Sequence, residues 1–237
     1  MTKINFTDNS QQNIKSCSHF SVRIKDFFRY LIDNILPPRG DFAIVKKLDE
    51  KTISTLPKAK DVEEMDWIHP LFHYKDNKVR ALIWELKYKE NTRTLEHVGK
   101  LLYEEILAKI SDIALFDSDA EFLLIPIPIT SERRIERGFN QSEYISKSIL
   151  ENDLGHVLIY APQWLLKTKD TPRQSHSESK QERTLNLLGA FHADSRVSGQ
   201  YIILIDDVIT TGSTLSEARN TLLSTGARDV FAFTIAH

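Results

Sequence analysis

The stretch YIILIDDVITTGST, residues 201–214, decides the fold. It opens with four successive apolar residues, Ile202 to Ile205, where a half-buried strand would alternate apolar with polar residues. Such a run is typical of a central strand in a parallel α/β sheet, because that strand is buried on both faces. We therefore predict an α/β fold with a mostly parallel central sheet flanked by helices.

Two adjacent carboxylates, Asp206 and Asp207, follow the apolar run directly. Because two unpaired carboxylates are costly to bury together, we expect the strand to end there, at a solvated edge. In open α/β sheets, ligands bind at the carboxyl edge of the strands. The two acids are therefore the candidate catalytic residues.

The residues after the acids are suited to binding a phosphate group. Four hydroxyls surround a glycine that lets the backbone approach a ligand: Thr210, Thr211, Gly212, Ser213 and Thr214. Thr214 and Glu217 have the spacing of a capping box, so we expect a helix from about Thr214 to Gly226, with N–H groups that bind an anion. An ordinary turn would explain one aspartate and one threonine, but not the whole string. The pattern predicts a sugar phosphate ligand.

The segment ILIDDVITTGST resembles the phosphoribosyl-diphosphate binding motif of type I phosphoribosyltransferases, in which Asp-Asp follows an apolar strand and Thr-Thr-Gly-x-Thr comes two residues later. Four further segments narrow the resemblance to the ComF family, which is associated with competence and DNA uptake. They are YKDNKVRALIWELKYKEN (74–91), IPIPITSERRIERGFNQ (125–141), TPRQ (171–174) and RTLNLLGAF (183–191). Together they cover most of residues 70–237 in the family's order.

The resemblance implies a type I phosphoribosyltransferase-like fold that binds 5-phosphoribosyl 1-diphosphate with Mg²⁺, which the diphosphate carries. Thr210 to Thr214 would hold the 5-phosphate, and Asp206 and Asp207 would hold the ribose hydroxyls. The acids would also stabilise the positive charge that develops at the anomeric carbon as diphosphate leaves. Phosphoribosyl would then pass to a nitrogen nucleophile, as in a glycosyltransferase, but no residue identifies the acceptor.

A second group of candidate residues follows an earlier apolar strand, predicted at 122–127. Two prolines should end its pairing early and give a rigid exit loop, and IPIPIT resembles the diphosphate-binding loop of the type I enzymes. Arg133 and Arg137 are then candidate diphosphate ligands, because guanidinium groups bind phosphate oxygens bidentately. Lys87 is a further candidate for the same role. For all three, a solvated basic face is the alternative interpretation.

Two other classes of function remain open. The first is a non-catalytic ComF-type competence factor that assists the uptake of single-stranded DNA, with DNA-uptake proteins as partners. Arg133, Arg134, Arg137 and Phe139 would then belong to a basic groove with a stacking aromatic ring. The second is a receiver-type phosphotransfer domain, which also has Asp-Asp after a strand but requires these acids near the start of the domain.

Other elements follow from apolar periodicity and from capping residues. Asn140 and Glu143 have the spacing of a second capping box, with Phe139 and Tyr144 as its hydrophobic staple, so a helix should start at Asn140. We also expect helices at 76–87 and 92–113, strands at 163–167 and 229–235, and a mobile polar loop at 168–183.

The N-terminal part of the chain differs from the rest. We predict a disordered tail at 1–20, a helix with a degenerate zinc-ribbon-like module at 21–66, and a phosphoribosyltransferase-like domain at 67–237. Many ComF-like proteins carry a cysteine-rich zinc ribbon after an apolar helix and a proline pair. Here the prolines at 37 and 38 remain but no cysteine follows them. Because structural zinc needs four ligands, we expect no zinc.

The composition is that of a globular protein, with 41% hydrophobic and 27% charged residues. The formal net charge of −2 argues neither for nor against a nucleic-acid partner. Cys17 is the only cysteine, which excludes an intrachain disulfide framework. No segment approaches the roughly 20 apolar residues of a transmembrane helix, and residues 1–12 lack an apolar signal core, so we expect a cytoplasmic protein.

Overall fold

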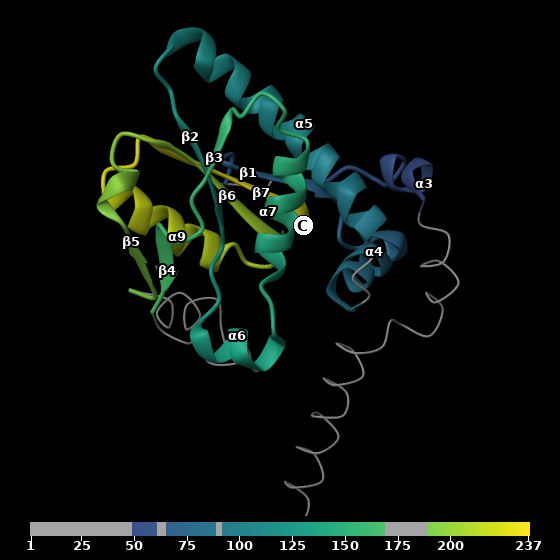
Figure 1. Ribbon diagram of the computed structural model, residues 1–237. Coiled ribbons are helices and arrows are strands. Elements are labelled where there is room, and N and C mark those ends of the chain that lie inside the picture. Colours follow the sequence, from purple (N-terminus) through teal and green to yellow (C-terminus); the bar gives the residue numbers. More distant parts are fainter. Residues whose placement is uncertain (1–48, 61–64, 89–91, 169–188) are drawn as a thin grey trace, which may run out of the picture.

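The computed structural model describes residues 49–60, 65–88, 92–168 and 189–237 (Figure 1). The predicted tail at 1–20, the predicted N-terminal helix with its proline pair, and all but the first residue of the predicted loop at 168–183 lie outside these residues.

A five-stranded sheet forms the centre of the molecule, in the order β1-β7-β6-β2-β3, and every pairing in it is parallel. The strands are β1 (Ile68–Phe72), β2 (Phe122–Pro126), β3 (Leu158–Tyr160), β6 (Tyr201–Val208) and β7 (Asp229–Ala236). The predicted α/β fold with a parallel central sheet is confirmed. The predicted last strand also lies beside the strand that carries the acids.

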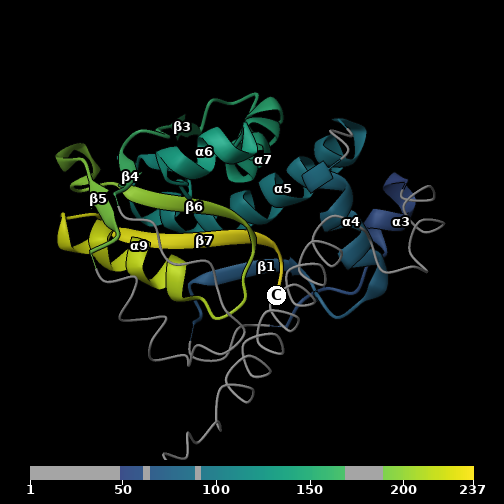
Figure 2. The same ribbon diagram turned by 90° about the horizontal axis from the view of Figure 1, so that it is seen from below.

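Helices cover both faces of this sheet (Figure 2). On one face lie α4 (Asn77–Tyr88), α5 (Thr92–Phe116) and α7 (Gln141–Glu151), and on the other lies α9 (Ser213–Ser224). The helices expected at 76–87 and 92–113 are confirmed as α4 and α5. Asp76 caps α4, since its Oδ1 accepts hydrogen bonds from the N–H groups of Lys78 and Val79.

The apolar run of β6 is buried on both faces, as its sequence predicts. Ile203 and Ile205 pack into the core that includes residues of α4, α5 and α7. Ile202 and Leu204 pack into a second core that includes residues of α9. All four side chains are 0% exposed. The strand that ends in the acids is therefore anchored from both sides.

The described part of the N-terminal region packs on the same domain. Residues 49–60 contain a short helix, α3 (Glu50–Ser54), capped by Asp49. Ile53 and Leu56 are buried in the same core cluster as Phe72 of β1. The backbone of Lys58 also forms an antiparallel bridge with Phe72.

The connection from β2 to α7 contains the predicted arginines. Pairing between β2 and β6 ends at Pro126, opposite Ile205, as the prolines predict. The chain then forms a short helix, α6 (Ser131–Arg137), beyond the carboxyl end of β2 (Figure 1). Thr130 caps the start of α6, and Gly138, with a φ of 79°, ends it.

The predicted start of α7 is confirmed, with one correction. Asn140 is the N-cap and accepts a hydrogen bond from the N–H of Ser142, and the rings of Phe139 and Tyr144 meet edge to face 5.6 Å apart, as the staple requires. Glu143 does not complete the capping box, because its carboxylate forms an ion pair with Arg134 of α6.

A small two-stranded antiparallel sheet flanks residues 169–188. It consists of β4 (Leu165–Lys167) and β5 (Phe191–Ala193), and a single 3₁₀ turn, η1 (Ser195–Val197), follows β5. The strand expected at 163–167 is thus confirmed in its second half. Among the described residues, no helix combines the length and the apolarity that a membrane span requires.

Candidate functional site

The acid pair lies within β6, which corrects the expectation that the strand ends at the acids. β6 runs on to Val208 because its ladder with β7 continues, with Asp206 opposite Thr234 and Val208 opposite Ala236. On the other side, the ladder with β2 ends at Pro126, and the N–H of Ile127 donates to the carbonyl of Ile205, one residue before the acids. The acids are therefore paired along one edge only, and both are partly accessible to solvent.

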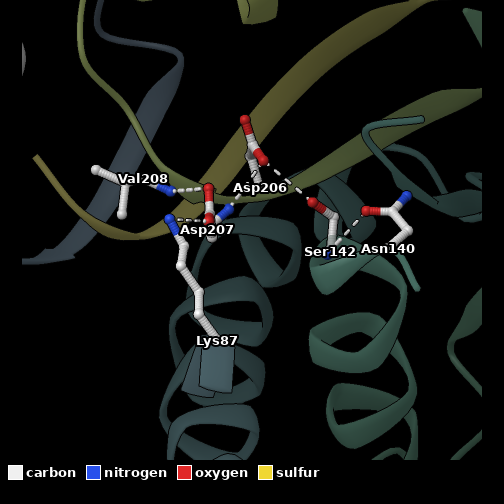
Figure 3. Close-up of polar contacts among 6 residues, drawn as sticks. All are labelled: Lys87, Asn140, Ser142, Asp206, Asp207 and Val208. Atoms are coloured by element: carbon white, nitrogen blue, oxygen red, sulfur yellow. Dashed lines mark hydrogen bonds and ion pairs between the residues drawn. The ribbon is translucent and has the colours of Figure 1, made fainter. Parts of the chain in front are cut away.

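Asp207 is held by a cation from another element (Figure 3). The ammonium of Lys87, near the end of α4, lies 2.8 Å from Asp207 Oδ2. The other oxygen, Oδ1, accepts a hydrogen bond of 2.7 Å from the N–H of Val208. Burial alone would lower the pKa of Lys87, but attraction to Asp207, with help from Asp206, raises it above its usual value. The Lys87 side chain therefore stays charged beside the acids.

Asp206 is held by hydrogen bonds rather than by a direct ion pair. Its Oδ1 accepts from the hydroxyl of Ser142 at 3.0 Å and from the N–H of Asp207 at 2.9 Å. Burial, followed by repulsion from Asp207, raises the pKa of Asp206 from 3.8 to about 7. The two adjacent carboxylates thus differ in environment, and a carboxyl that titrates near neutrality is a frequent feature of functional sites.

Ser142 was not predicted as a site residue, although the segment that precedes it was. Its position in the first turn of α7 follows from Asn140, whose Oδ1 accepts from the N–H of Ser142. Asn140 Nδ2 donates to the carbonyl of Ile127 at 2.9 Å, which fixes this turn to the loop after β2. In the sequence, Ser142 directly follows the segment 125–141 and lies two residues after the predicted N-cap Asn140. This position does not reveal which distant residue the serine hydroxyl contacts.

The start of α9 differs from the expected capping box. The helix begins at Ser213, and its N-cap is Gly212, which offers no side-chain cap. Glu217, the predicted box partner of Thr214, accepts a hydrogen bond of 2.7 Å from the N–H of Gly189. The N–H of Ser213 donates to the hydroxyl of Thr211 at 3.4 Å, so the partial positive charge at the start of the helix is directed at the loop after the acids.

The predicted phosphate loop has a tight conformation. The hydroxyls of Thr211 and Ser213 lie 2.9 Å apart and share a hydrogen bond. Gly212 has a φ of 72°, a conformation that side chains rarely adopt. A Cβ at Gly212 would lie 2.8 Å from the sulfur of Met65, so the residues before β1 contact this loop closely. Thr210 is exposed and Thr214 is partly buried.

The structure places the other predicted ligands around this edge of the sheet. Lys87, predicted to bind diphosphate, lies on Asp207 and so belongs to the same cluster as the acids. Arg133, on α6, is partly exposed beyond the carboxyl end of β2. The backbone of Arg137 ends α6, and its side chain lies outside what the structure describes. The roles of these residues stay predictions.

Within the described ranges, no three His, Cys, Asp or Glu side chains gather to form a metal site. The carboxylates of Asp206 and Asp207 are already contacted by Ser142, Lys87 and backbone N–H groups. The Mg²⁺ that the sequence predicts to arrive with the diphosphate stays a prediction.

Comparison with known proteins finds relatives that resemble part of the chain. No protein-family model matches the chain. It is 31% identical over 151 residues to the DNA utilization protein YhgH of Salmonella typhimurium, and 36% identical over 121 residues to the competence protein ComFC of Bacillus subtilis. The chain is therefore similar to these two relatives, but it spans less than two thirds of the length of either one. The matches span 63% of this chain and 63% of YhgH, and 49% of this chain and 45% of ComFC.

Two solved structures also resemble the chain. Phosphoribosylpyrophosphate synthetase from Mycobacterium smegmatis is 19% identical, with a TM-score of 0.33 over 58% of this chain and 33% of that protein. Glutamine phosphoribosylpyrophosphate amidotransferase from B. subtilis is 17% identical, with a TM-score of 0.39 over 65% of this chain and 30% of that protein. The parallel α/β sheet expected from the sequence is confirmed by the strand order, and the type I phosphoribosyltransferase-like fold stays a prediction. These distant likenesses say nothing of ligand or activity.

Proposed function

We propose that this protein is a member of the ComF family and binds 5-phosphoribosyl 1-diphosphate, with Mg²⁺ carried by the diphosphate. The observation that carries the proposal is the juxtaposition at the end of β6. Asp206 and Asp207, which have different environments, are separated by two residues from the hydroxyl loop at 210–214. This loop contains Gly212, the N-cap of α9, which offers no side-chain cap. Carboxylates accept hydrogen bonds from sugar hydroxyls, and an uncapped helix start favours a phosphate.

In this proposal each part of the cluster has a separate role. Asp206 and Asp207 accept hydrogen bonds from the ribose hydroxyls, and residues 210–214 hold the 5-phosphate. Lys87, already beside Asp207, contributes positive charge next to the carbon from which diphosphate leaves, and Arg133 and Arg137 supply guanidinium groups for diphosphate. Mg²⁺ neutralises the diphosphate when bound. The acids would stabilise positive charge on the sugar if that bond breaks.

The test compares ligands as well as variants. Isothermal titration calorimetry would measure binding of phosphoribosyl diphosphate, with and without Mg²⁺, and of ribose 5-phosphate against 2-deoxyribose 5-phosphate. Wild type should prefer the ribose form by about ten-fold or more, because the missing hydroxyl leaves a carboxylate without its hydrogen bond. The double variant Asp206→Asn/Asp207→Asn should bind both sugars weakly and equally.

A matched control separates this effect from a general loss of charge. Asp119→Asn makes the same chemical change at an exposed position before β2 and should leave all affinities unchanged. Equal affinity of wild type for the two sugar phosphates would remove the assigned role of the acids. Transfer to a nitrogen nucleophile is tested separately, by diphosphate release in the presence of candidate amines.

A second candidate function, binding of single-stranded DNA, is favoured by a surface on α6 and α7. Tyr144 is 46% exposed and meets the ring of Phe139, and the ammonium of Lys147 lies 5.9 Å from the centre of the Tyr144 ring. Arg133 and Arg134 lie on the adjoining helix α6. Exposed aromatic rings beside basic side chains suit the stacking of bases and the binding of phosphates. The relatives' names, competence protein and DNA utilization protein, agree with such a role.

Fluorescence anisotropy with a labelled thymidine oligonucleotide tests this second function. Tyr144→Ala should weaken binding by about five-fold or more through lost stacking, and higher salt should weaken binding by the wild type. Phe116→Ala is the control, because Phe116 is also an exposed ring but lies at the end of α5 (Figure 1). Equal binding by Tyr144→Ala and Phe116→Ala would refute the assignment of this surface.

A further inference from the structure

Ser142 is a buried contact of Asp206 that belongs to none of the predicted ligand groups. Its residue is 3% exposed, and its hydroxyl donates to Asp206 Oδ1 at 3.0 Å (Figure 3). The two residues are 64 positions apart and come from different elements, α7 and β6. A buried hydroxyl that donates to a carboxylate stabilises the ionised form of that carboxylate.

The position of Ser142 is fixed on both sides. Its N–H donates to Asn140 Oδ1, and Asn140 in turn donates to the carbonyl of Ile127. Its own carbonyl accepts a hydrogen bond of 2.8 Å from the hydroxyl of Ser146, one turn further along α7. The serine hydroxyl therefore reaches the carboxylate from a rigid base.

The groups around Asp206 leave its charge finely balanced. Burial and the neighbouring Asp207 favour the protonated form, whereas the Ser142 hydroxyl and the ammonium of Lys87 favour the ionised form. From β7, the residue opposite Asp206 is the neutral Thr234. Because these influences bring the pKa of Asp206 to about 7, the loss of one donor changes its charge at neutral pH.

We propose that Ser142 is a positioning residue for Asp206, whose hydroxyl keeps this carboxylate ionised so that it accepts hydrogen bonds from the hydroxyls of a sugar phosphate. The inference deepens the proposed function and rests on it for the identity of the ligand. The segment RGFNQS, residues 137–142, would then have two roles: its arginine binds diphosphate, and its serine contacts the acid pair directly.

The first test needs no ligand. Carbon-13 NMR of aspartate-labelled protein would follow the titration of the Asp206 carboxyl, with Asp206→Asn to assign its signal. Ser142→Ala should raise the pKa of Asp206 by about one unit. Ser148→Ala is the matched control, because it removes the hydroxyl of a residue that is 2% exposed on the same helix and that donates to the backbone carbonyl of Leu95 rather than to Asp206. The same Asp206 pKa in both variants would overturn the inference.

The second test uses ribose 5-phosphate at two pH values. Relative to Ser148→Ala, Ser142→Ala should bind about five-fold more weakly at pH 7 and equally well at pH 9, where Asp206 is ionised in both variants. An equal loss at both pH values would show that Ser142 acts only through packing, and would refute the positioning role. If wild type binds no sugar phosphate at either pH, the proposed function fails, whereas the NMR titration still decides whether Ser142 controls Asp206.

Discussion

Asp206→Asn should stabilise the protein above neutral pH while it removes a group proposed to bind the ligand. In the folded chain the pKa of Asp206 is raised to about 7, against 3.8 for an ordinary aspartate, first through burial and then through Asp207. Below pH 3.8 the carboxyl is protonated in both the folded and the unfolded state, so it has no effect on stability. As the pH rises, the unfolded chain releases this proton first, and the folded state loses stability until the pH exceeds 7.

The size of the effect follows from this shift in pKa. With 1.36 kcal/mol per unit, the raised pKa of Asp206 lowers the unfolding free energy by about 2 kcal/mol at pH 5 and by about 4 kcal/mol at pH 8. Partial access to solvent makes these values upper limits. The neutral amide of Asn avoids this cost, and its oxygen can still accept from the hydroxyl of Ser142. The gain in unfolding free energy should therefore be larger at pH 8 than at pH 5.

Urea unfolding of wild type, Asp206→Asn and Asp119→Asn at both pH values measures the effect. Asp119→Asn is the control, because it makes the same chemical change at an exposed position and should leave the unfolding free energy unchanged at both pH values. A gain of equal size at pH 5 and pH 8, or a loss at pH 8, would refute the reasoning. A variant that is more stable but binds ligand weakly would show that the acid pair is retained at the expense of stability.

Three further predictions concern the surroundings of the site. Lys87→Met should lower the unfolding free energy at neutral pH by no more than about 1 kcal/mol, since the Lys87 side chain is 37% exposed. The same variant should bind phosphoribosyl diphosphate at least ten-fold more weakly by calorimetry, and unchanged affinity would contradict the role of Lys87. Gly99→Ala places a Cβ 2.3 Å from Ser148 Oγ and 2.8 Å from the carbonyl carbon of Ser148. The cost of this overpacking, about 1–3 kcal/mol, should exceed the gain of about 1 kcal/mol in helix propensity. A melting temperature at or above that of wild type would refute this prediction. Gly212→Ala should lower the unfolding free energy by about 1–2 kcal/mol because of the positive φ at this position, and should displace Met65. Calorimetry should also detect a loss of affinity for ribose 5-phosphate. Wild-type affinity would exclude a role for this loop in binding.

Local patterns in the sequence were sufficient for most elements of the fold. The apolar run 202–205 predicted a strand buried on both faces, and its residues are all 0% exposed. Asn140 predicted the start of α7, and the prolines predicted the early end of β2. These features depend on neighbouring residues along the chain, through periodicity, capping and the geometry of proline, so a single sequence contains the information.

The predictions that failed depended on partners from elsewhere in the chain. β6 continues through the acids because β7 stays paired with it as far as Val208, and no residue close to Asp206 in the sequence predicts that pairing. Glu217 has the spacing of a capping box, yet it accepts from Gly189, which the chain brings to it from 28 residues away. Local propensity is overruled where a tertiary partner offers a better hydrogen bond.

For the site, the sequence alone determined which residue types are present and at which edge of the sheet they gather: the acids, the hydroxyl loop and the helix start. Only the tertiary structure decided which partner each acid has: Lys87 of α4 forms an ion pair with Asp207, and Ser142 of α7 donates a hydrogen bond to Asp206. The physical reason is that the charge of a carboxyl depends on burial and on groups within a few ångströms. Those groups come from elements that meet only when the chain folds.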